Sequence, residues 1–474
     1  MITSRDGAGV DGKIKFLLIN PAAKQWRAAE WKSPPLRTRI FRYAMLSSLS
    51  VAASMPENVL TRIVDEETEP VDFDTDADLI GISFMTFNAP RAYEIADTFR
   101  LQKGKPVILG GYHPSCLPEE AIRHADAVCI GEAEPVMPQL IRDFQNHCVQ
   151  HFYSNGLADL ALLRIPDRGL LRQGLYAAVD AIQATRGCPQ ACTFCSITSF
   201  FHHRFRTRPV ESVIEELRSL GKRILFLDDN LTADADYAKD LFAHMIPLRK
   251  HWFSQCSVTI ADDQELLDLA AASGCKGLFI GFESLEQKNL TAWKKVFTRA
   301  SDYRRAIDRL HEAGIGVYAG IVLGHDHDTP ESFKRTLEFL QESRIDALQA
   351  TILTPFPNTP LFKDLERQGR IIDWDWAHYD FRHVVFEPLQ MSRQMLQAGH
   401  DWVLGNFFSA GSVLRRIIGQ WSYLELSTIA RVTIPLNIGY RMRLKTDGTW
   451  DDHADIPSIE SALPPLTRAS VRSH

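Results

Sequence analysis

The chain has few cysteines, no excess of positive charge and no long apolar segment. Eight cysteines among 474 residues are too few for a scaffold held together by disulfides. The formal net charge of −6 argues against a nucleic-acid partner, because such proteins usually carry a basic surface. No segment approaches the roughly 20 apolar residues of a membrane-spanning helix, and residues 1–12 lack the apolar core of a signal peptide. We therefore expect a cytoplasmic protein whose thiols stay reduced.

Short apolar runs that alternate with amphipathic segments fill the first third of the chain. Because strands buried on both faces and separated by helices form parallel sheets, this pattern predicts a doubly wound, Rossmann-like α/β domain over residues 13–147. Turn-forming residues over 147–180 mark the end of the domain. The expected strands are 14–20, 79–84, 106–110 and 127–131, and the expected helices are 39–53, 89–102, 118–124 and 135–144.

A second series of strands and helices predicts a partial, TIM-like (β/α)6 barrel over residues 175–390. The site of such a barrel lies at the carboxyl ends of its strands. Residues 391–474 are expected to form a small helical C-terminal region with a flexible tail, because the last stretch is polar and rich in proline and serine. The expected barrel strands are 181–185, 223–229, 256–260, 277–283, 316–324 and 347–353.

Three cysteines, Cys188, Cys192 and Cys195, lie close together in the segment CPQACTFC. Soft thiolate ligands select iron–sulfur clusters or zinc. Structural zinc takes four ligands, and a four-iron cluster usually takes four cysteines. Because no fourth cysteine is near, one iron would be left open to bind a substrate. The alternative is a zinc site completed by His202 or His203.

The CxxxCxxC segment, with Phe194 before its third cysteine and at the end of the first barrel strand, resembles the loop of the radical S-adenosylmethionine (SAM) superfamily. The resemblance implies an oxygen-sensitive enzyme whose [4Fe-4S] cluster binds the amino and carboxylate groups of SAM. Reduced flavodoxin or ferredoxin would supply the electron. SAM is then cleaved to methionine and a 5′-deoxyadenosyl radical, which abstracts hydrogen from an unactivated C–H bond.

The same resemblance implies a set of SAM contacts at the ends of the barrel strands. Acceptors after the second strand would bind the methionine ammonium, Glu283 would bind the ribose hydroxyls, and a glycine-bearing strand would pass the adenine. Asp228 could instead cap a helix. His325 and His327 replace the usual acidic residue after the fifth strand and are interpreted as loop histidines. The expected SAM contacts are Phe194, Asp228, Asp229, Asn230, Glu283, Gly320 and Gly324.

Residues 13–145 resemble the cobalamin-binding domain that precedes one class of radical SAM enzymes. The matching segments are ADLIGIS (77–83), VILGGYHPS (107–115), LPEE (117–120) and ADAVCIGEAE (125–134). Glycines after a strand let the backbone approach a large ligand, and such ligands bind beyond the carboxyl ends of the strands. The implied cobalamin contacts are Ser83, Gly110, Gly111, His113, Gly131 and Glu132. His113 could instead be a turn histidine that caps the strand.

The chain departs from other cobalamin proteins because it lacks the Asp-x-His-x-x-Gly motif, whose histidine ligates cobalt. Many members of the class resemble it in this respect, and some members with this domain bind no corrinoid. The first hypothesis is a cobalamin-dependent methyltransferase that acts on an unactivated carbon of a small-molecule or lipid intermediate and uses two SAM molecules per turnover. No catalytic side chain is identified.

Two other functions stay open. One is a radical SAM cyclase, or an enzyme that forms or rearranges C–C bonds, whose N-terminal domain binds substrate or is structural. The other is a non-catalytic corrinoid- or metal-binding protein. An RNA methylthiolating enzyme would need a second set of cluster cysteines. Residues 412–445 mix apolar residues with arginines; a helix that covers the barrel is favoured there over contact with a membrane surface.

Overall fold

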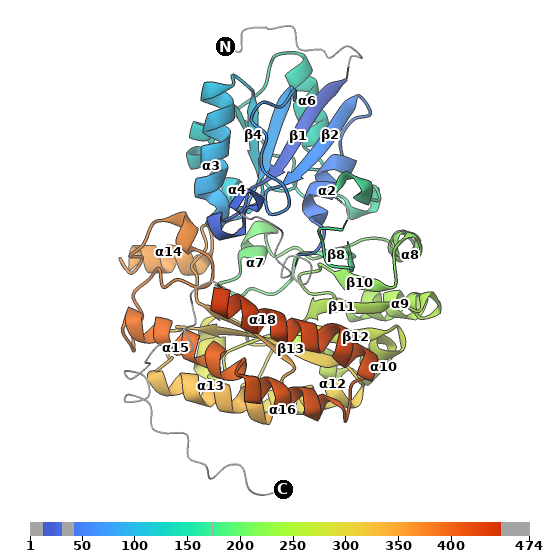
Figure 1. Cartoon of the computed structure of the whole chain (residues 1–474), viewed down its shortest axis with the longest axis vertical. Helices are drawn as coiled ribbons and strands as arrows, with labels where there is room; N and C mark the ends of the chain where they lie inside the picture. The colour runs from blue at the N-terminus through green and yellow to red at the C-terminus, as the bar shows by residue number, and fades with distance from the viewer. Residues whose placement is uncertain (1–12, 31–41, 173, 447–474) are drawn as a thin grey trace, which may run out of the picture.

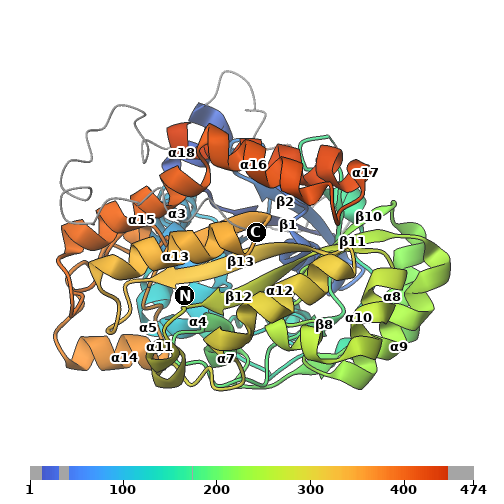
Figure 2. The ribbon, with the colours of Figure 1, turned by 90° about the horizontal axis from the view of Figure 1, so that it is seen from below.

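The computed structural model describes residues 13–30, 42–172 and 174–446. Two α/β units are stacked along the long axis of the molecule, with the N-terminal unit above and the larger unit below (Figure 1). Helices of the C-terminal region lie along the larger unit (Figures 1 and 2). Within the described residues, no helix is both long and apolar enough to cross a membrane.

The N-terminal unit is a six-stranded sheet in the order β2-β1-β3-β4-β5-β6. Every neighbouring pair is parallel. This is the flavodoxin-like doubly wound order, in which the strand order reverses at β1 and β3 and ligands bind beyond the carboxyl ends. The strands are β1 (Ile14–Asn20), β2 (Val59–Asp65), β3 (Leu79–Ser83), β4 (Val107–Gly110), β5 (Ala127–Cys129) and β6 (Phe152–Tyr153).

The two edge strands, β2 and β6, were not expected from the sequence. In β2 the residues Leu60, Thr61 and Arg62 are exposed or half-buried, and β6 has only two residues. Neither gives the continuous apolar run by which buried parallel strands are recognised. The predicted doubly wound fold is correct, but the sheet is wider than the sequence indicated.

Helices cover both faces of this sheet and give it two cores. Leu49, Leu140 and Ile141 pack on one face, and Ile95 and Phe99 pack on the other. The predicted helix over 39–53 begins partly outside the described residues and is α2 (Leu46–Ala53) where it is described. The other helices are α3 (Ala89–Asp97), α4 (Tyr112–Cys116), α5 (Pro118–Ala121) and α6 (Met137–Gln145).

The larger unit is a second parallel six-stranded sheet in the order β14-β13-β12-β11-β10-β7. Its first and last strands do not pair, so the barrel is open on one side, as predicted for a partial barrel. The strands are β7 (Asp180–Ile182), β10 (Arg223–Phe226), β11 (His251–Cys256), β12 (Cys275–Glu283), β13 (Gly316–Leu323) and β14 (Ala347–Ile352).

The third barrel strand lies earlier in the chain than predicted. The sequence favoured residues 256–260, but β11 ends at Cys256, and a 3-10 helix, η9 (Val258–Asp262), follows. Burial alternates along β11, with Trp252, Ser254 and Cys256 facing the core. The Ser257 side chain then caps η9 by accepting a hydrogen bond from the Thr259 amide. A serine cap therefore ends the strand before the apolar residues that suggested it.

Helices pack around the outside of this sheet and hold a core that includes Phe226, Trp252, Phe282 and Phe333. After β14 the described part of the chain forms further helices, the last of which, α18, contacts β13 through Tyr440 and Tyr318. The helices are α7 (Ser196–Phe200), α8 (Val210–Ser219), α9 (Ala235–Met245), α10 (Gln264–Ala272), α11 (Gln287–Ala292), α12 (Tyr303–Glu312), α13 (Pro330–Glu342), α14 (Pro360–Arg367), α15 (Arg393–Phe407), α16 (Ala410–Gln420), α17 (Leu426–Thr428), the π-helical η12 (Ile429–Thr433) and α18 (Ile434–Thr446).

Candidate active site

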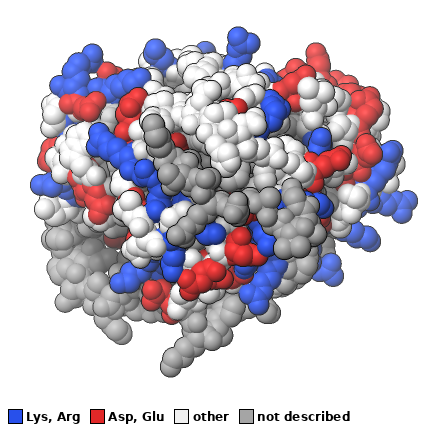
Figure 3. Space-filling view, turned by 90° about the horizontal axis from the view of Figure 1, so that it is seen from above, with Lys and Arg blue, Asp and Glu red and all other residues white. Residues whose placement is uncertain are grey.

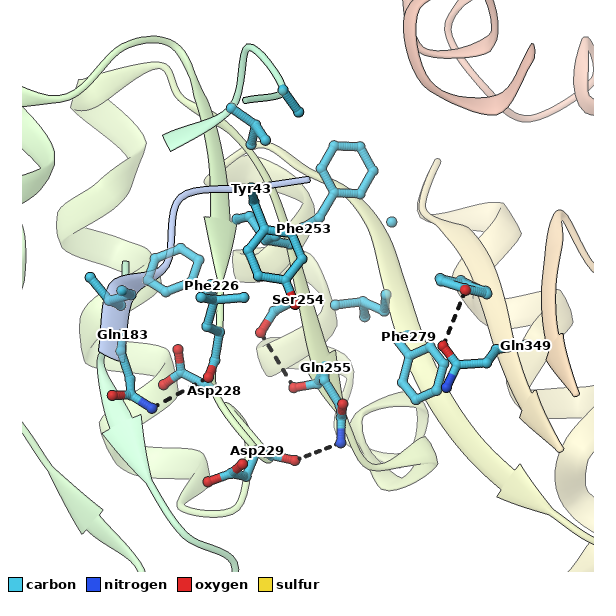
Figure 4. A pocket seen from close by; sticks show the side chains of 18 of the residues that line it. Tyr43, Gln183, Phe226, Asp228, Asp229, Phe253, Ser254, Gln255, Phe279 and Gln349 are labelled. Carbon is cyan, nitrogen blue, oxygen red and sulfur yellow. Dashed lines mark hydrogen bonds between the residues drawn. The ribbon is translucent and has the colours of Figure 1, made fainter. Parts of the chain in front are cut away.

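A cavity of about 1020 Å³ lies between the two units. Ser83, Gly111 and Gly131 line it from the ends of β3, β4 and β5, while Asp229 lines it from the end of β10. α18 closes another side through Tyr440, whose hydroxyl is hydrogen-bonded to that of Tyr318 on β13. Figure 4 shows aromatic rings along the wall and the carboxylates of Asp228 and Asp229 at one end. Residues from both predicted cofactor sites therefore meet in one cavity.

The three clustered cysteines lie on the loop between β8 (Thr185–Arg186) and α7. The Cys195 amide donates to the Cys192 carbonyl at 3.2 Å, which turns the loop back on itself. At Gly187, φ is +84° and an added Cβ would lie 2.0 Å from the Arg204 carbonyl oxygen, so only glycine fits. Burial raises the pKa of the Cys192 thiol to about 12. The buried thiols therefore stay protonated unless a bound cation stabilises their thiolates.

The donor set fits a cluster held by three protein ligands better than a closed zinc site. Within the described residues, no group of three His, Cys, Asp or Glu side chains is placed to hold a single metal ion. His202 and His203 are both exposed, and His203 contacts the Gln190 carbonyl. A zinc site completed by either histidine therefore has no support from their positions, whereas three clustered sulfurs, of which that of Cys192 is buried, suit a soft iron–sulfur cluster.

The residues after β10 hold the cysteine loop in place. The buried Asp228 carboxylate accepts hydrogen bonds from the Ala184 amide and from the amide and hydroxyl of Thr185. Asp229 accepts from the Gly187 amide at 2.8 Å. Burial raises the pKa of Asp228 to about 7 and that of Asp229 to about 6. Both carboxylates support the loop, and their role in SAM binding stays a prediction.

Asn230 connects this support to a cysteine. Its amide nitrogen lies 3.9 Å from Cys188 Sγ, and its amide oxygen accepts from the Ser257 amide at 3.0 Å. The side chain is buried. Because a donor beside a sulfur stabilises its thiolate, Asn230 acts on the proposed cluster ligand rather than lying free in the cavity.

Glu283 ends β12 at an irregularity in the pairing with β13, and its φ is +63°. Its Oε1 accepts from Lys295 Nζ at 2.8 Å, and Lys295 also donates to the Gly281 carbonyl at 2.7 Å. An acid at the end of an apolar strand needs a partner, and no local pattern in the sequence indicates that Lys295 is that partner. The predicted contact of Glu283 with a ribose stays a prediction.

The two predicted glycines of β13 are required by packing. A Cβ on Gly320 would lie 2.7 Å from the Phe279 ring. Gly324 has φ of +99°, and a Cβ there would lie 2.6 Å from Leu396. Its amide donates to Asp328 at 3.0 Å. These contacts explain both glycines without a ligand, so the expected adenine contact stays a prediction.

His325, directly after Gly324, is buried against the cysteine loop. Its ring lies 4.1 Å from the Trp293 ring, which in turn lies 4.7 Å from the ring of Phe194. Neither ring nitrogen of His325 has a hydrogen-bond partner among the described residues. Burial lowers its pKa to about 4. The side chain is therefore neutral at pH 7 and packs as part of the wall behind Phe194.

We expect His325 to make the protein less stable as the pH falls. The folded-state pKa of about 4 is below the unfolded value of about 6.5, so between these values only the unfolded state binds the proton. The free energy of unfolding should fall by about 3 kcal/mol at most over this interval. Urea unfolding of the apoprotein from pH 7 to pH 4 measures the effect. His325→Phe should remove this part of the pH dependence, and His327→Gln should keep it; equal slopes in both variants would contradict the prediction.

The predicted cobalamin contacts fall into two groups. Ser83, Gly111, Gly131 and Glu132 line the cavity. Gly131 has φ of +86°, and a Cβ built on it would meet nothing within 4 Å, so the backbone there is open to a large ligand. The Gly111 backbone, with φ of +98°, is pressed against Phe84, where a Cβ would lie 2.8 Å from backbone atoms.

Gly110 and His113 do not line the cavity. Gly110 packs on Cys129. His113 is 0% exposed, and its Nε2 lies 3.1 Å from Glu120 Oε1. Glu120 also accepts from Trp376 at 3.1 Å, so this pair joins the first unit to the segment after the barrel. The position of His113 therefore does not support the predicted cobalamin contact, because the side chain turns into the protein from the end of β4.

Glu132 belongs to a buried ion-pair cluster, Arg186–Glu132–Glu134–Arg206. Arg186 binds Glu132 at 2.5 Å and Glu134 at 2.7 Å. Arg206, on β9 (Arg206–Thr207), binds the other Glu132 oxygen at 2.7 Å. The Glu132 carboxylate is thus committed to arginines. This cluster connects the loop after β5 to the strand that leads into the cysteine loop, and no local pattern in the sequence indicates it.

Two family models match the chain. The radical SAM superfamily model matches residues 182–340, and the B12 binding domain model matches residues 58–141. The first match includes the cysteine loop and four of the six barrel strands in full, β10 to β13. The second includes Ser83, Gly111 and Gly131.

The chain is also similar to named proteins. It is 31% identical to a bacteriochlorophyllide d C-12(1)-methyltransferase of Chlorobaculum tepidum, over 78% of this chain and 86% of the relative. It is 29% identical to a hopanoid C-2 methylase of Rhodopseudomonas palustris, over 69% of this chain and 65% of the relative. Among solved structures, the fold is similar to that of TsrM of Kitasatospora setae, with a TM-score of 0.61 and 16% sequence identity; the match covers 88% of this chain and 92% of TsrM. The fold is also similar to that of OxsB, with a TM-score of 0.64 and 15% sequence identity; the match covers 91% of this chain and 72% of OxsB.

Proposed function

The chain belongs to the radical SAM superfamily and carries a B12-binding domain before its radical SAM domain, and we propose that it is a cobalamin-dependent methyltransferase acting on an unactivated carbon. One observation carries the proposal: residues from the ends of both sheets line a single cavity. Transfer of a methyl group from a corrinoid to a substrate radical needs both cofactors to face the same space. The cavity between the two units supports that arrangement.

The residues present fit the cofactors of the two families. Cys188, Cys192 and Cys195 would hold a [4Fe-4S] cluster, and the open backbone at Gly131 would face cobalamin. When bound, the cluster and SAM supply a hydrogen-abstracting radical and cobalamin supplies the methyl group. Asp228, Asp229 and Asn230 support the cysteine loop. Glu283, held by Lys295, is the candidate acceptor for SAM hydroxyls.

We propose a large, mainly apolar substrate. Phe253 and Phe279 line the cavity from the barrel, and Tyr43, Leu436 and Tyr440 line it from elsewhere (Figure 4). The cavity of about 1020 Å³ would be shared with the two cofactors, so its apolar walls rather than its volume support this kind of substrate. Relatives of the chain are named for bacteriochlorophyllide d and for hopanoids, which are molecules of this kind. A polycyclic lipid or tetrapyrrole intermediate is therefore the substrate class that we propose.

The decisive experiment is turnover with SAM that carries a deuterated methyl group. Anaerobically reconstituted protein with cobalamin and reduced flavodoxin or ferredoxin should transfer the label to carbon of a tetrapyrrole or polycyclic lipid. Each methylated product should be accompanied by one S-adenosylhomocysteine, one methionine and one 5′-deoxyadenosine, which carries the hydrogen removed from the substrate. Unlabelled product formed together with 5′-deoxyadenosine would instead indicate a cyclase or a C–C bond-rearranging enzyme. A relative that is 26% identical is named as such an enzyme, the anaerobic magnesium-protoporphyrin IX monomethyl ester cyclase.

Gly131→Val is expected to weaken cobalamin binding by at least about tenfold, because the added side chain would enter the space beside the ligand. The visible absorbance of bound cobalamin, titrated into the apoprotein, measures the affinity. Gly156→Val is the matched control: Gly156 also has positive φ (+70°) and open space around it, but it does not line the cavity. Equal affinities of the two variants would contradict the proposed cobalamin site.

Three finer expectations from the sequence remain proposals. A reduced flavodoxin or ferredoxin is the proposed electron donor, and a cytoplasmic location is the proposed compartment. No nucleic-acid partner is proposed. Among the described residues on the face in Figure 3, acidic and basic side chains are interspersed and form no large area of positive charge.

A further inference from the structure

The C-terminal helices expose a stripe of apolar side chains. Leu414, Ile418 and Trp421 are spaced by four and three residues, so they share one face at the end of α16. Their exposed fractions are 59%, 55% and 64%, and that of Leu426, at the start of α17, is 70%. We call these four residues the α16–α17 patch. Clustered exposed apolar residues on one helix face mark an interaction site more often than isolated ones.

Positive charge accompanies this patch. Arg415 and Arg431 are exposed, and neither forms an ion pair with a described residue. The nearby exposed acid, Glu425, is already paired with Lys276 at 2.8 Å. The patch therefore combines apolar side chains, a tryptophan and unpaired arginines. This composition suits the interface of an anionic bilayer, where tryptophan lies at the headgroup level and arginine binds acidic lipids.

The inner face of the same segment lines the cavity. Leu424, Val432, Leu436 and Tyr440 are wall residues of the cavity. On α18, Ile438 is exposed while Leu436 and Tyr440 face inward. Figure 2 shows α16, α17 and α18 along one edge of the molecule. The region from α16 to α18 therefore carries the patch mainly on α16, while the cavity wall comes from the residues that follow it, from Leu424 to Tyr440.

We propose that the α16–α17 patch docks on an anionic membrane surface, so that the segment closing the cavity lies against the lipid. Both interpretations of residues 412–445 then apply, one to each side of the segment, because its inner side covers the barrel and its outer side meets the membrane. A second copy of the chain suits the patch less well, since a two-fold contact would bring the unpaired arginines of both copies together. Docking on the membrane would place the cavity where it could take an apolar substrate from the bilayer. That consequence rests on the proposed function, whereas docking itself does not.

Vesicle flotation tests the proposal with the full chain. Wild-type protein should bind vesicles of phosphatidylglycerol and phosphatidylcholine at low salt, and more weakly with phosphatidylcholine alone or at high salt. Leu414→Glu/Ile418→Glu/Trp421→Glu should lower the bound fraction by about tenfold or more, because it replaces apolar contacts with charges that acidic lipids repel. Arg415→Gln/Arg431→Gln should lower binding only to the acidic vesicles.

The matched control is Leu101→Glu/Leu162→Glu, since these leucines are 75% and 78% exposed but lie in the N-terminal unit or the linker. It should bind like wild type. Circular dichroism of each variant establishes that it is folded. The proposal is overturned if wild-type protein does not bind the vesicles at low salt, or if the control variant loses as much binding as the triple variant. It is also overturned if light scattering shows a dimer that only the triple variant disrupts while no protein binds the vesicles. These results do not depend on methyl transfer, so failure of the proposed function is detected separately.

Discussion

Replacing Cys192 by alanine should reduce the cleavage of SAM to background level. Cys192 is buried on the loop that leaves β8, between Cys188 and Cys195. With one sulfur removed, two protein ligands remain, which is one fewer than the proposed cluster needs. The loss should therefore be complete rather than graded. Anaerobic 5′-deoxyadenosine formation with dithionite measures activity, and iron content with the electron paramagnetic resonance spectrum of the reduced protein measures the cluster.

Two other cysteines provide the controls. Cys148 is exposed and Cys275 is fully enclosed in the barrel core. Cys148→Ala should retain the cluster and the activity. Cys275→Ala should lose some stability through the cavity it leaves but should keep its iron. If Cys192→Ala kept a normal cluster, or if either control lost its iron, the proposed assignment of the three ligands would be wrong.

The cysteine loop could be predicted because its information is local. Three thiols within eight residues, after an apolar strand and before a helix, indicate both the proposed ligands and their place in the fold. The central strands were predictable for the same reason, since each is a continuous apolar run. β2 was missed because an edge strand needs no such run, and the third barrel strand was misplaced because its capping serine, Ser257, is a weak signal beside the apolar residues that follow.

The partners of the site residues could not be predicted, because they are distant in the chain. Arg186 and Glu132 are 54 positions apart, and nothing in either segment indicates the other. His113, which is buried beside Glu120, illustrates a second limit. Its place after a glycine pair at the end of β4 suggested a ligand contact, but a residue at a strand end can turn into the protein as easily as outward, and burial decides this only in three dimensions.

The ion-pair cluster around Arg186 should be a sensitive charged site, because its side chains are at most about one-fifth exposed. Arg186→Gln would leave Glu132 and Glu134 buried between the two units with half of their positive charge removed. Breaking a buried ion pair by removing one partner costs about 3–5 kcal/mol. The free energy of the first unfolding transition in urea should fall by this order. Arg186→Gln/Glu134→Gln should recover much of the loss, because the remaining Glu132 keeps its contact with Arg206.

An exposed pair gives the control for this prediction. Arg304 and Glu342 lie 2.8 Å apart, with side chains 55% and 53% exposed. Arg304→Gln should change the free energy of unfolding by less than about 1 kcal/mol, because water stabilises the remaining charge. Equal effects of Arg304→Gln and Arg186→Gln would show that burial does not govern the cluster.

Arg186→Gln should also separate the two halves of the proposed reaction. Arg186 lies two positions before Cys188, and Glu132 follows Gly131, which faces the proposed corrinoid. Loss of the link should therefore leave the cysteine loop with its own supports, Asp228, Asp229 and Asn230, while the loop after β5 moves relative to it. SAM cleavage should continue in the variant, and the ratio of 5′-deoxyadenosine to methylated product should rise. An enzyme that is only destabilised would lose 5′-deoxyadenosine and methylated product in proportion. The ratio of the two products, measured at a temperature where the variant is folded, therefore distinguishes a positioning role of Arg186 from a purely structural one.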